Sequence, residues 1–318
     1  MTLVPFTHAH VPAAALLVAA GVGRLRRTVP RVPRPWSEPE HVARVLHGLV
    51  DHGAGLAALD DEQLVGFQAA ITVDGRGGRW TYTSDVGHAA PPDPLGRVRA
   101  RLYGGLAGGW LRAACPEHVV SVLADDEPAL ATYAALGFGH HVVDLVGEIG
   151  PVERRPLPPG VELRRADPAD AAAVSGLEAG LRRHLEASPI FLGSAPVVPA
   201  EVARRELADD ARATFLAERA GRAVAFLRIG PCADDVATIV RDPGTASVTA
   251  AFTEPGLRGL DIGSHLLAAA VGWAEGAGYA RWAVDHESAN GEASRFWSRH
   301  ALPVTISMSR RLSPALVP

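Results

Sequence analysis

The residues with the clearest chemical potential lie in one stretch, Pro255-Gly-Leu-Arg258-Gly259-Leu-Asp261-Ile262-Gly263-Ser264-His-Leu-Leu, between an expected strand and an expected helix. Glycine lets the backbone approach a ligand closely, and the first amides of a helix are unpaired donors at the positive end of its dipole. An arginine just before them can add a charge-assisted contact. The stretch therefore predicts a phosphate-binding site, although a plain strand-to-helix connection would look similar.

Two more segments follow in a fixed order. Ala280-Arg-Trp-Ala-Val-Asp285 is typical of a strand, and Asn290-Gly-Glu-Ala293-Ser-Arg-Phe296-Trp297 of a helix. With the glycine stretch they resemble the GNAT superfamily of N-acetyltransferases, which carries a pyrophosphate loop Arg/Gln-x-x-Gly-x-Gly/Ala and an Asn-x-x-Ala-x-x-Phe/Leu-Tyr helix. The resemblance covers the C-terminal half well and the N-terminal half more loosely, through Leu130-Ala-Thr-Tyr133-Ala-Ala-Leu-Gly137-Phe138.

The resemblance implies an acyltransferase that moves an acetyl group from acetyl-coenzyme A to an amine of a small molecule, directly, in a ternary complex. A neutral amine attacks the thioester carbonyl, whose oxygen is polarised by a backbone amide of a splayed strand. No metal is implied. The residues implied for binding acetyl-coenzyme A are Phe252, Thr253, Arg258, Gly259, Asp261, Ile262, Gly263, Ser264, Asn290, Phe296 and Trp297.

The attacking amine must lose a proton, so a base within reach should accelerate the reaction. Glu254, at the end of the expected strand, and His286 or Glu287, after the next strand, are the candidates, with Glu254 and His286 preferred. An ordinary solvated carboxylate at Glu254, or an ordinary loop histidine at His286, fits the sequence as well. Asn290 can likewise contact the pantetheine or cap its helix.

Two residues depart from the family pattern. Asp261 stands where the family has its middle glycine, so its carboxylate would repel a pyrophosphate unless it turns away to cap the helix. Trp297 stands where many members have a tyrosine that protonates the leaving thiolate, and an indole cannot act as that acid. The alternative function is therefore a non-catalytic binding or regulatory protein of the same fold.

The acceptor is expected to bind near residues 184–193, which fall between the first two helices of the C-terminal half. Ile190 and Phe191 could form a wall of its pocket or an apolar lid without a ligand.

A chain of 318 residues favours two domains. The Pro-rich segment 150–160 is typical of a linker, and the elements before and after it occur in the same order. Tyr133 matches Trp297, and Asp126 matches Asn290, which indicates an internal duplication. We expect an α+β fold of two tandem GNAT-like domains, each a mixed, mostly antiparallel twisted sheet flanked by helices: a degenerate domain at 1–149 and an acyl-coenzyme A domain at 161–318. Residues 304–308 should close the C-terminal sheet.

The composition of the chain argues against several other classes of protein. The formal net charge is −4 and all 31 cationic side chains are arginine, spread along the chain, so no nucleic-acid partner is expected. The apolar stretch 11–23 is too short to span a bilayer and predicts a buried helix. With only two cysteines, a reducing, cytoplasmic location is expected. His8-x-His10 and His140-His141 lack the companions of a metal site. The protein is expected to be a monomer or a homodimer.

Overall fold

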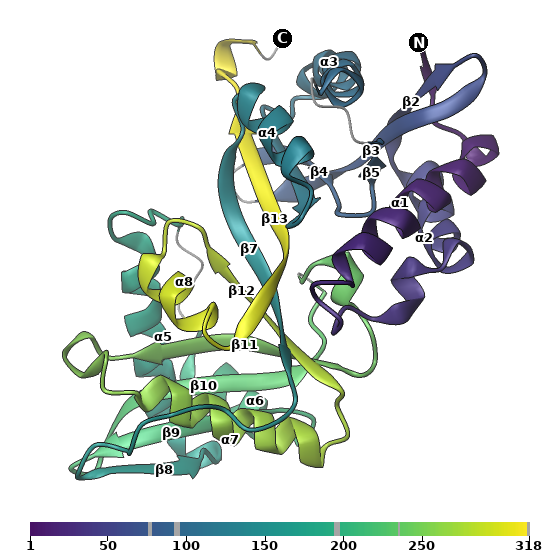
Figure 1. Ribbon diagram of the computed structural model, residues 1–318. Coiled ribbons are helices and arrows are strands. Elements are labelled where there is room, and N and C mark those ends of the chain that lie inside the picture. The colour runs from purple at the N-terminus through teal and green to yellow at the C-terminus, as the bar shows by residue number, and fades with distance from the viewer. Residues whose placement is uncertain (76–77, 92–95, 194–197, 235, 317–318) are drawn as a thin grey trace. The chain divides into compact units, whose positions relative to one another are not determined.

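The computed structural model describes residues 1–75, 78–91, 96–193, 198–234 and 236–316, and the chain divides into two compact units (Figure 1). Unit 1 consists of Met1–Asp144, Ala237–Val240 and Pro303–Pro318, and unit 2 of Leu145–Val236 and Arg241–Leu302. Each unit combines a mixed, mostly antiparallel sheet with flanking helices, which confirms the predicted fold class.

In unit 1 the strand order is β1-β2-β3-β4-β6-β13, and β5 also pairs with β3. Neighbours from β1 to β4 are antiparallel, whereas β4 and β6 are parallel. The elements are β1 (Thr2–Pro5), α1 (Val11–Leu25), α2 (Pro39–His52), β2 (Ala54–Asp60), β3 (Gln63–Gly75), β4 (Gly78–Thr83), β5 (His88–Ala89), α3 (Arg97–Arg112), β6 (Glu117–Leu123) and α4 (Glu127–Ala135).

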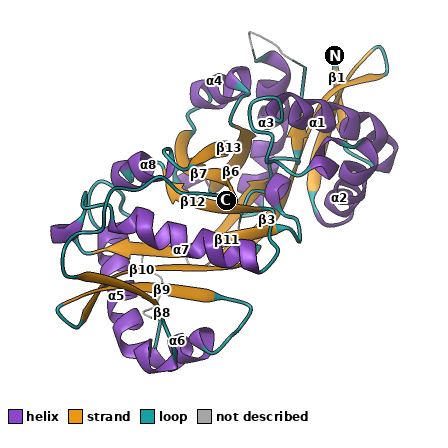
Figure 2. Ribbon diagram, turned by 60° about the horizontal axis from the view of Figure 1, so that its bottom comes forward, coloured by secondary structure: helices purple, strands orange, loops and turns teal. Residues whose placement is uncertain are grey.

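Unit 2 repeats this arrangement, with strand order β12-β11-β10-β9-β8 and one parallel pair, β11 with β12. Helix α7 packs against β9, β10 and β11, as Figure 2 shows, and α5 packs against β10 and β11. The elements are β8 (Val161–Arg165), α5 (Ala171–Glu186), α6 (Ala200–Leu207), β9 (Ala213–Arg219), β10 (Arg222–Pro231), β11 (Thr245–Thr253), α7 (Ile262–Gly276), β12 (Arg281–Glu287) and α8 (Gly291–Trp297). Short 3-10 helices are η1 (His8–His10), η2 (Arg34–Ser37), η3 (Pro168–Asp170), η4 (Thr238–Val240), η5 (Pro255–Leu257) and η6 (Pro314–Leu316).

The two helices expected to correspond begin in the same way. The Asp126 side chain accepts a hydrogen bond from the amide of Ala129 at the start of α4, and the Asn290 side chain accepts one from the amide of Ala293 at the start of α8, both at 3.1 Å. Both are N-caps that satisfy a helix amide without an internal partner.

The last strand differs from the expectation. Residues 304–308 belong to β13 (Ala301–Arg311), whose residues Thr305–Arg311 pair antiparallel with Leu123–Glu117 of β6 in unit 1. Strand β7 (Gly139–Glu148) begins in unit 1 and ends in unit 2. A run of apolar residues specifies a buried strand, but pairing uses backbone atoms, so the sequence pattern did not identify the partner.

Unit 1 contains a buried polar cluster next to α3. The guanidinium of Arg99 is 4% exposed and donates to the Ala90 carbonyl at 3.2 Å and to Asp126 at 2.7 Å. His88 packs edge-on against Tyr133, with ring centroids 5.8 Å apart, and its Nε2 lies 2.9 Å from the Ser121 carbonyl. Burial, with a further contribution from the positive charge of Arg99, lowers the pKa of His88 to about 4.

We expect the free energy of unfolding to fall as pH drops from about 6.5 to 4, because unfolded His88 takes up a proton that the folded form excludes. His88 contributes no penalty above pH 6.5 and, at full effect, a penalty of roughly 3 kcal/mol below pH 4. Urea denaturation at several pH values should show a shallower loss in His88→Gln than in the wild type. His52→Gln, at an exposed position, should follow the wild type; equal slopes in all three proteins would refute the assignment.

Candidate functional site

The site in unit 2 begins where two parallel strands separate. Strands β11 and β12 pair with each other at Thr245–Ser247 and Arg281–Ala283. They then continue to Thr253 and Glu287, and among the described residues they do not pair with each other again. The β10–β11 register shifts between Arg228 and Ile229, which is a bulge opposite the same region. The edge of β11 beyond Ser247 is therefore free to present backbone groups to a ligand.

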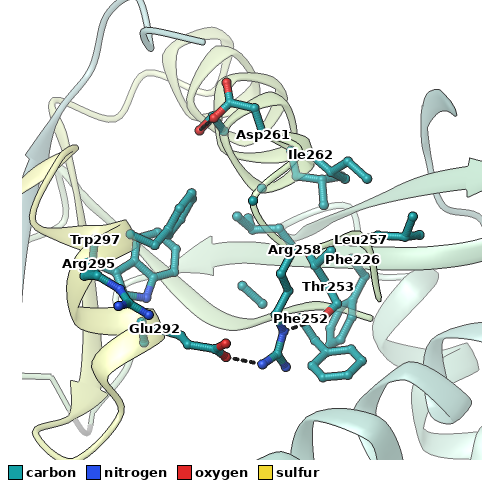
Figure 3. A pocket seen from close by; sticks show the side chains of 18 of the residues that line it. Phe226, Phe252, Thr253, Leu257, Arg258, Asp261, Ile262, Glu292, Arg295 and Trp297 are labelled. Carbon is teal, nitrogen blue, oxygen red and sulfur yellow. Dashed lines mark hydrogen bonds and ion pairs between the residues drawn. The ribbon is translucent and has the colours of Figure 1, made fainter. Parts of the chain in front are cut away.

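A cavity of about 620 Å³ lies at this separation. It is bordered by β10, β11, α5, η5, the first turn of α7 and α8 (Figure 3). The structure brings all the residues predicted to bind acetyl-coenzyme A to its wall: Phe252, Thr253, Arg258, Gly259, Asp261, Ile262, Gly263, Ser264, Asn290, Phe296 and Trp297. Their binding of the coenzyme stays a prediction.

The loop before α7 exposes backbone donors to the cavity. Gly259 has a φ of 75°, in the left-handed region that favours glycine. Among the described residues, the amides from Gly259 to Gly263 make no backbone hydrogen bond. A Cβ on Gly263 would lie 3.1 Å from the ring of Phe296, so this glycine allows α8 to pack closely. The loop has the free donors and the helix dipole that an anion requires.

Asp261 lines the cavity, but its carboxylate points away from the other side chains labelled in Figure 3 and makes no capping hydrogen bond to α7. Its carboxylate is 7% exposed and accepts hydrogen bonds from the backbone amide of Arg155 at 2.6 Å and from the Ser264 hydroxyl at 3.1 Å. Burial alone would raise the pKa of Asp261, but these two hydrogen bonds and the nearby arginines lower it below its usual value. The charge of Asp261 is thus satisfied by the Arg155 amide and the Ser264 hydroxyl and not by an amide of α7.

Three polar side chains lie together in another part of the cavity wall: Arg258, Glu292 and His184. Arg258 donates to the Thr253 carbonyl at 3.0 Å, binds the Glu292 carboxylate, and lies 5.5 Å from the Phe252 ring centroid. Nε2 of His184 is 3.8 Å from the same carboxylate. The guanidinium of Arg258 therefore faces the strand end in this structure, while its backbone belongs to the loop.

The two proton acceptors predicted from the sequence are not brought to the cavity wall. Glu254 forms an ion pair with Arg222 through both carboxylate oxygens, and these hydrogen bonds lower the pKa of Glu254. His286 is buried, and its Nδ1 lies 3.0 Å from the Glu287 carbonyl. Both assignments stay predictions. Phe191 is 70% exposed and, like Ile190, does not line this cavity.

The aromatic positions of the two units have different surroundings. Trp297 lines the cavity, is 5% exposed and packs on Trp282 with ring centroids 6.0 Å apart. Tyr133 is fully buried, burial raises its pKa, and its hydroxyl has no partner among the described residues. The Trp297 indole therefore offers no acidic proton to the cavity, and the Tyr133 hydroxyl is buried within unit 1.

The sequence did not single out several polar residues of the wall. Three charged residues of the wall are spaced three and four positions apart around Phe296: Glu292, Arg295 and Arg299. This helical spacing could have indicated that they share a face with Phe296. His184 was noted only as the start of an acceptor loop. Arg155 gave no signal, because it lies in the Pro-rich segment, far from the loop in sequence.

Comparisons with known proteins agree with this geometry. A model of the Acetyltransferase (GNAT) family matches residues 181–301. That range contains all of the cavity-lining residues except Arg155. The chain therefore contains a GNAT acetyltransferase domain in its C-terminal half.

Two solved structures have a similar fold over nearly the whole chain, and a third gives a lower TM-score. A GCN5-related N-acetyltransferase from Sphaerobacter thermophilus is 17% identical, with 100% of this chain and 96% of that chain covered and a TM-score of 0.59. A glucosamine N-acetyltransferase region of a fungal multi-domain GH3 beta-N-acetylglucosaminidase is 12% identical, with 96% and 38% covered and a TM-score of 0.54. A tandem GNAT protein from the clavulanic acid biosynthesis pathway is 14% identical, with 98% and 99% covered and a TM-score of 0.48.

No curated relative, membrane-spanning helix or metal site was found in the described part of the chain. Among proteins of curated function, no sequence relative was found. Within the described part of the chain, no helix is long and apolar enough to cross a membrane. In the same residues, no group of three or more His, Cys, Asp or Glu side chains could hold a metal ion.

Asn290→Ala should lower the free energy of unfolding by about 1 kcal/mol, because it removes the N-cap of α8. Asn290→Asp should retain the cap, as Asp126 does in the corresponding helix. Urea denaturation measures the cap, and acetyl-coenzyme A titration of Asn290→Asp tests a pantetheine contact separately. A stable Asn290→Ala protein would contradict the capping role.

Proposed function

We propose that unit 2 transfers the acetyl group of acetyl-coenzyme A to an amine of a small molecule. The observation that carries this proposal is the cavity where β11 and β12 separate, because it joins an anion-binding loop to an open strand edge within the matched family domain. The amine nitrogen would attack the thioester carbonyl, the carbon–sulfur bond would break, and the thiolate would leave and take a proton from solvent.

The charges of the cavity support a polyanionic donor. Arg155, Arg258, Arg295 and Arg299 line it, against the two carboxylates of Asp261 and Glu292. Both carboxylates already bind partners in the protein. The loop amides fit a pyrophosphate, and the apolar wall around Phe252 and Trp297 fits the pantetheine chain.

Arg258→Ala should weaken acetyl-coenzyme A binding by about 1.5 to 3 kcal/mol, the scale of a hydrogen bond to a charged group. Arg222→Ala provides a matched control, since Arg222 is also paired with a glutamate but does not line the cavity. Isothermal titration calorimetry with both variants measures the difference. Equal affinities for the wild type and Arg258→Ala would remove Arg258 from the donor site.

The cavity contains two groups suited to accept the amine's proton, His184 and Glu292. A neutral imidazole at His184 would take the proton, and the Glu292 carboxylate would stabilise the resulting imidazolium. Glu292 also ties Arg258 to this cluster, so the three side chains connect the donor loop with the acceptor side. We assign the proton transfer to His184 and its positioning to Glu292.

His184→Gln should lower kcat by roughly 10-fold to 1,000-fold, with donor affinity unchanged. Glu254→Gln is the competing variant, because Glu254 is the base predicted from the sequence. Steady-state kinetics with a panel of amines, glucosamine among them because one structural neighbour is named for it, tests both. Loss of activity in Glu254→Gln alone would assign the base to Glu254.

A non-catalytic binding protein is the second candidate, and Trp297 favours it because an indole cannot protonate the leaving thiolate. A thiol with a pKa near 8.5 can nevertheless leave without full protonation at neutral pH. Binding of acetyl-coenzyme A without turnover of any amine would support the second candidate, and no binding at all would exclude the first.

A further inference from the structure

Arg155, in the Pro-rich segment before β8, lies on the loop predicted to bind phosphate. Its backbone amide donates to Asp261 at 2.6 Å, and its carbonyl oxygen lies 2.8 Å from Nε2 of His265 on α7. Its guanidinium donates from Nη2 to the Gly259 carbonyl at 2.7 Å. Both the backbone and the side chain of Arg155 are therefore fixed to the two ends of the same loop.

Most of the Arg155 guanidinium remains available. The side chain is 68% exposed and lines the cavity, and among the described residues only its Nη2 donates a hydrogen bond. The nearest carboxylate oxygen, Oδ1 of Asp261, is 4.0 Å from Nη2, which is beyond hydrogen-bond distance. A guanidinium has five N–H donors in a planar fork that matches phosphate oxygens.

We propose that Arg155 binds a phosphate group of coenzyme A and that Asp261 is the positioning residue that holds it there. This inference rests on the proposed function, since it names a further residue of the same donor site. Asp261 stands where the family pattern has a glycine, and its carboxylate anchors the segment that carries Arg155. In this way it places the positive charge of Arg155 beside the loop.

The same contacts could instead block the loop. If the bond between Arg155 and the Gly259 carbonyl kept phosphate out, removal of the side chain would tighten binding. The direction of the change in affinity therefore separates a ligand from an obstruction.

The experiment titrates acetyl-coenzyme A into the full-length protein and its variants by calorimetry. Arg155→Ala should raise Kd by about 10-fold or more, as for a lost hydrogen bond between charged groups. Arg154→Ala is the matched control, because Arg154 is adjacent, exposed and outside the cavity lining, and among the described residues its side chain donates only to the Val152 carbonyl. It should retain the wild-type Kd.

Two further titrations define the contact. Dephospho-coenzyme A lacks the 3′-phosphate, so the effect of Arg155→Ala should disappear with it if Arg155 binds that group, and persist if Arg155 binds the pyrophosphate. Asp261→Gly should weaken binding in the wild type and add little in the Arg155→Ala background, because the two residues act as one unit. Thermal unfolding of each variant shows whether the fold is retained.

The outcomes are distinct for the two proposals. If the wild type binds acetyl-coenzyme A and Arg155→Ala binds equally or more tightly, the role of Arg155 is refuted and the donor site stands. Tighter binding by Asp261→Gly would refute the positioning role of Asp261. If the wild type does not bind acetyl-coenzyme A, the proposed function fails and the role of Arg155 fails with it.

Discussion

The candidate site depends on one interruption of a β-ladder. Strands β11 and β12 are parallel and paired over three residues each, and the residues of β11 that line the cavity, Ala251, Phe252 and Thr253, lie beyond the point where the strands separate. Because α7 follows β11 and α8 follows β12, the separation also sets the gap between the first turn of α7 and the face of α8. A cavity results between elements that are each locally regular.

Unit 1 has a similar order of elements, but the start of the helix predicted to correspond to α7 differs. In unit 1 the parallel pair is β4 with β6, over Trp80–Thr83 and Glu117–Val120, and α3 again begins after a left-handed residue, Gly96. The third residue of α3 is Arg99, whereas the third residue of α7 is Ser264. Arg99 is buried and bound to the cap residue Asp126, and Tyr133 is buried beside it. A long, buried side chain thus stands at the third position of α3, whereas the third position of α7 is a serine that lines the cavity.

Features that depend on neighbouring residues could be predicted from the sequence, whereas contacts between distant residues could not. The caps Asp126 and Asn290, the glycine loop and the repeated order of elements depend on residues within a few positions of one another, and the structure contains them. The pairing of β13 with β6, the Glu254–Arg222 ion pair and the contact of Arg155 with Asp261 join residues far apart in the chain. Spacing within one segment carries no information about such partners, so the sequence indicated the glycine loop before α7 but not the residues that lie against it.

Asp261 shows why a departure from a family pattern needs its surroundings before it is interpreted. From the sequence alone, a carboxylate beside a pyrophosphate indicates repulsion unless the side chain turns away to cap the helix. In the structure its charge is satisfied by a backbone amide and a hydroxyl, and it is largely removed from solvent. The substitution also occurs in the left-handed conformation, which is unfavourable for most side chains but tolerated by aspartate. The free-energy cost of that conformation is small compared with the stabilisation that two hydrogen bonds give to the buried carboxylate. Asp261 is therefore compatible with an intact loop. Of the two departures from the family pattern, Trp297 alone remains as an argument for lost chemistry.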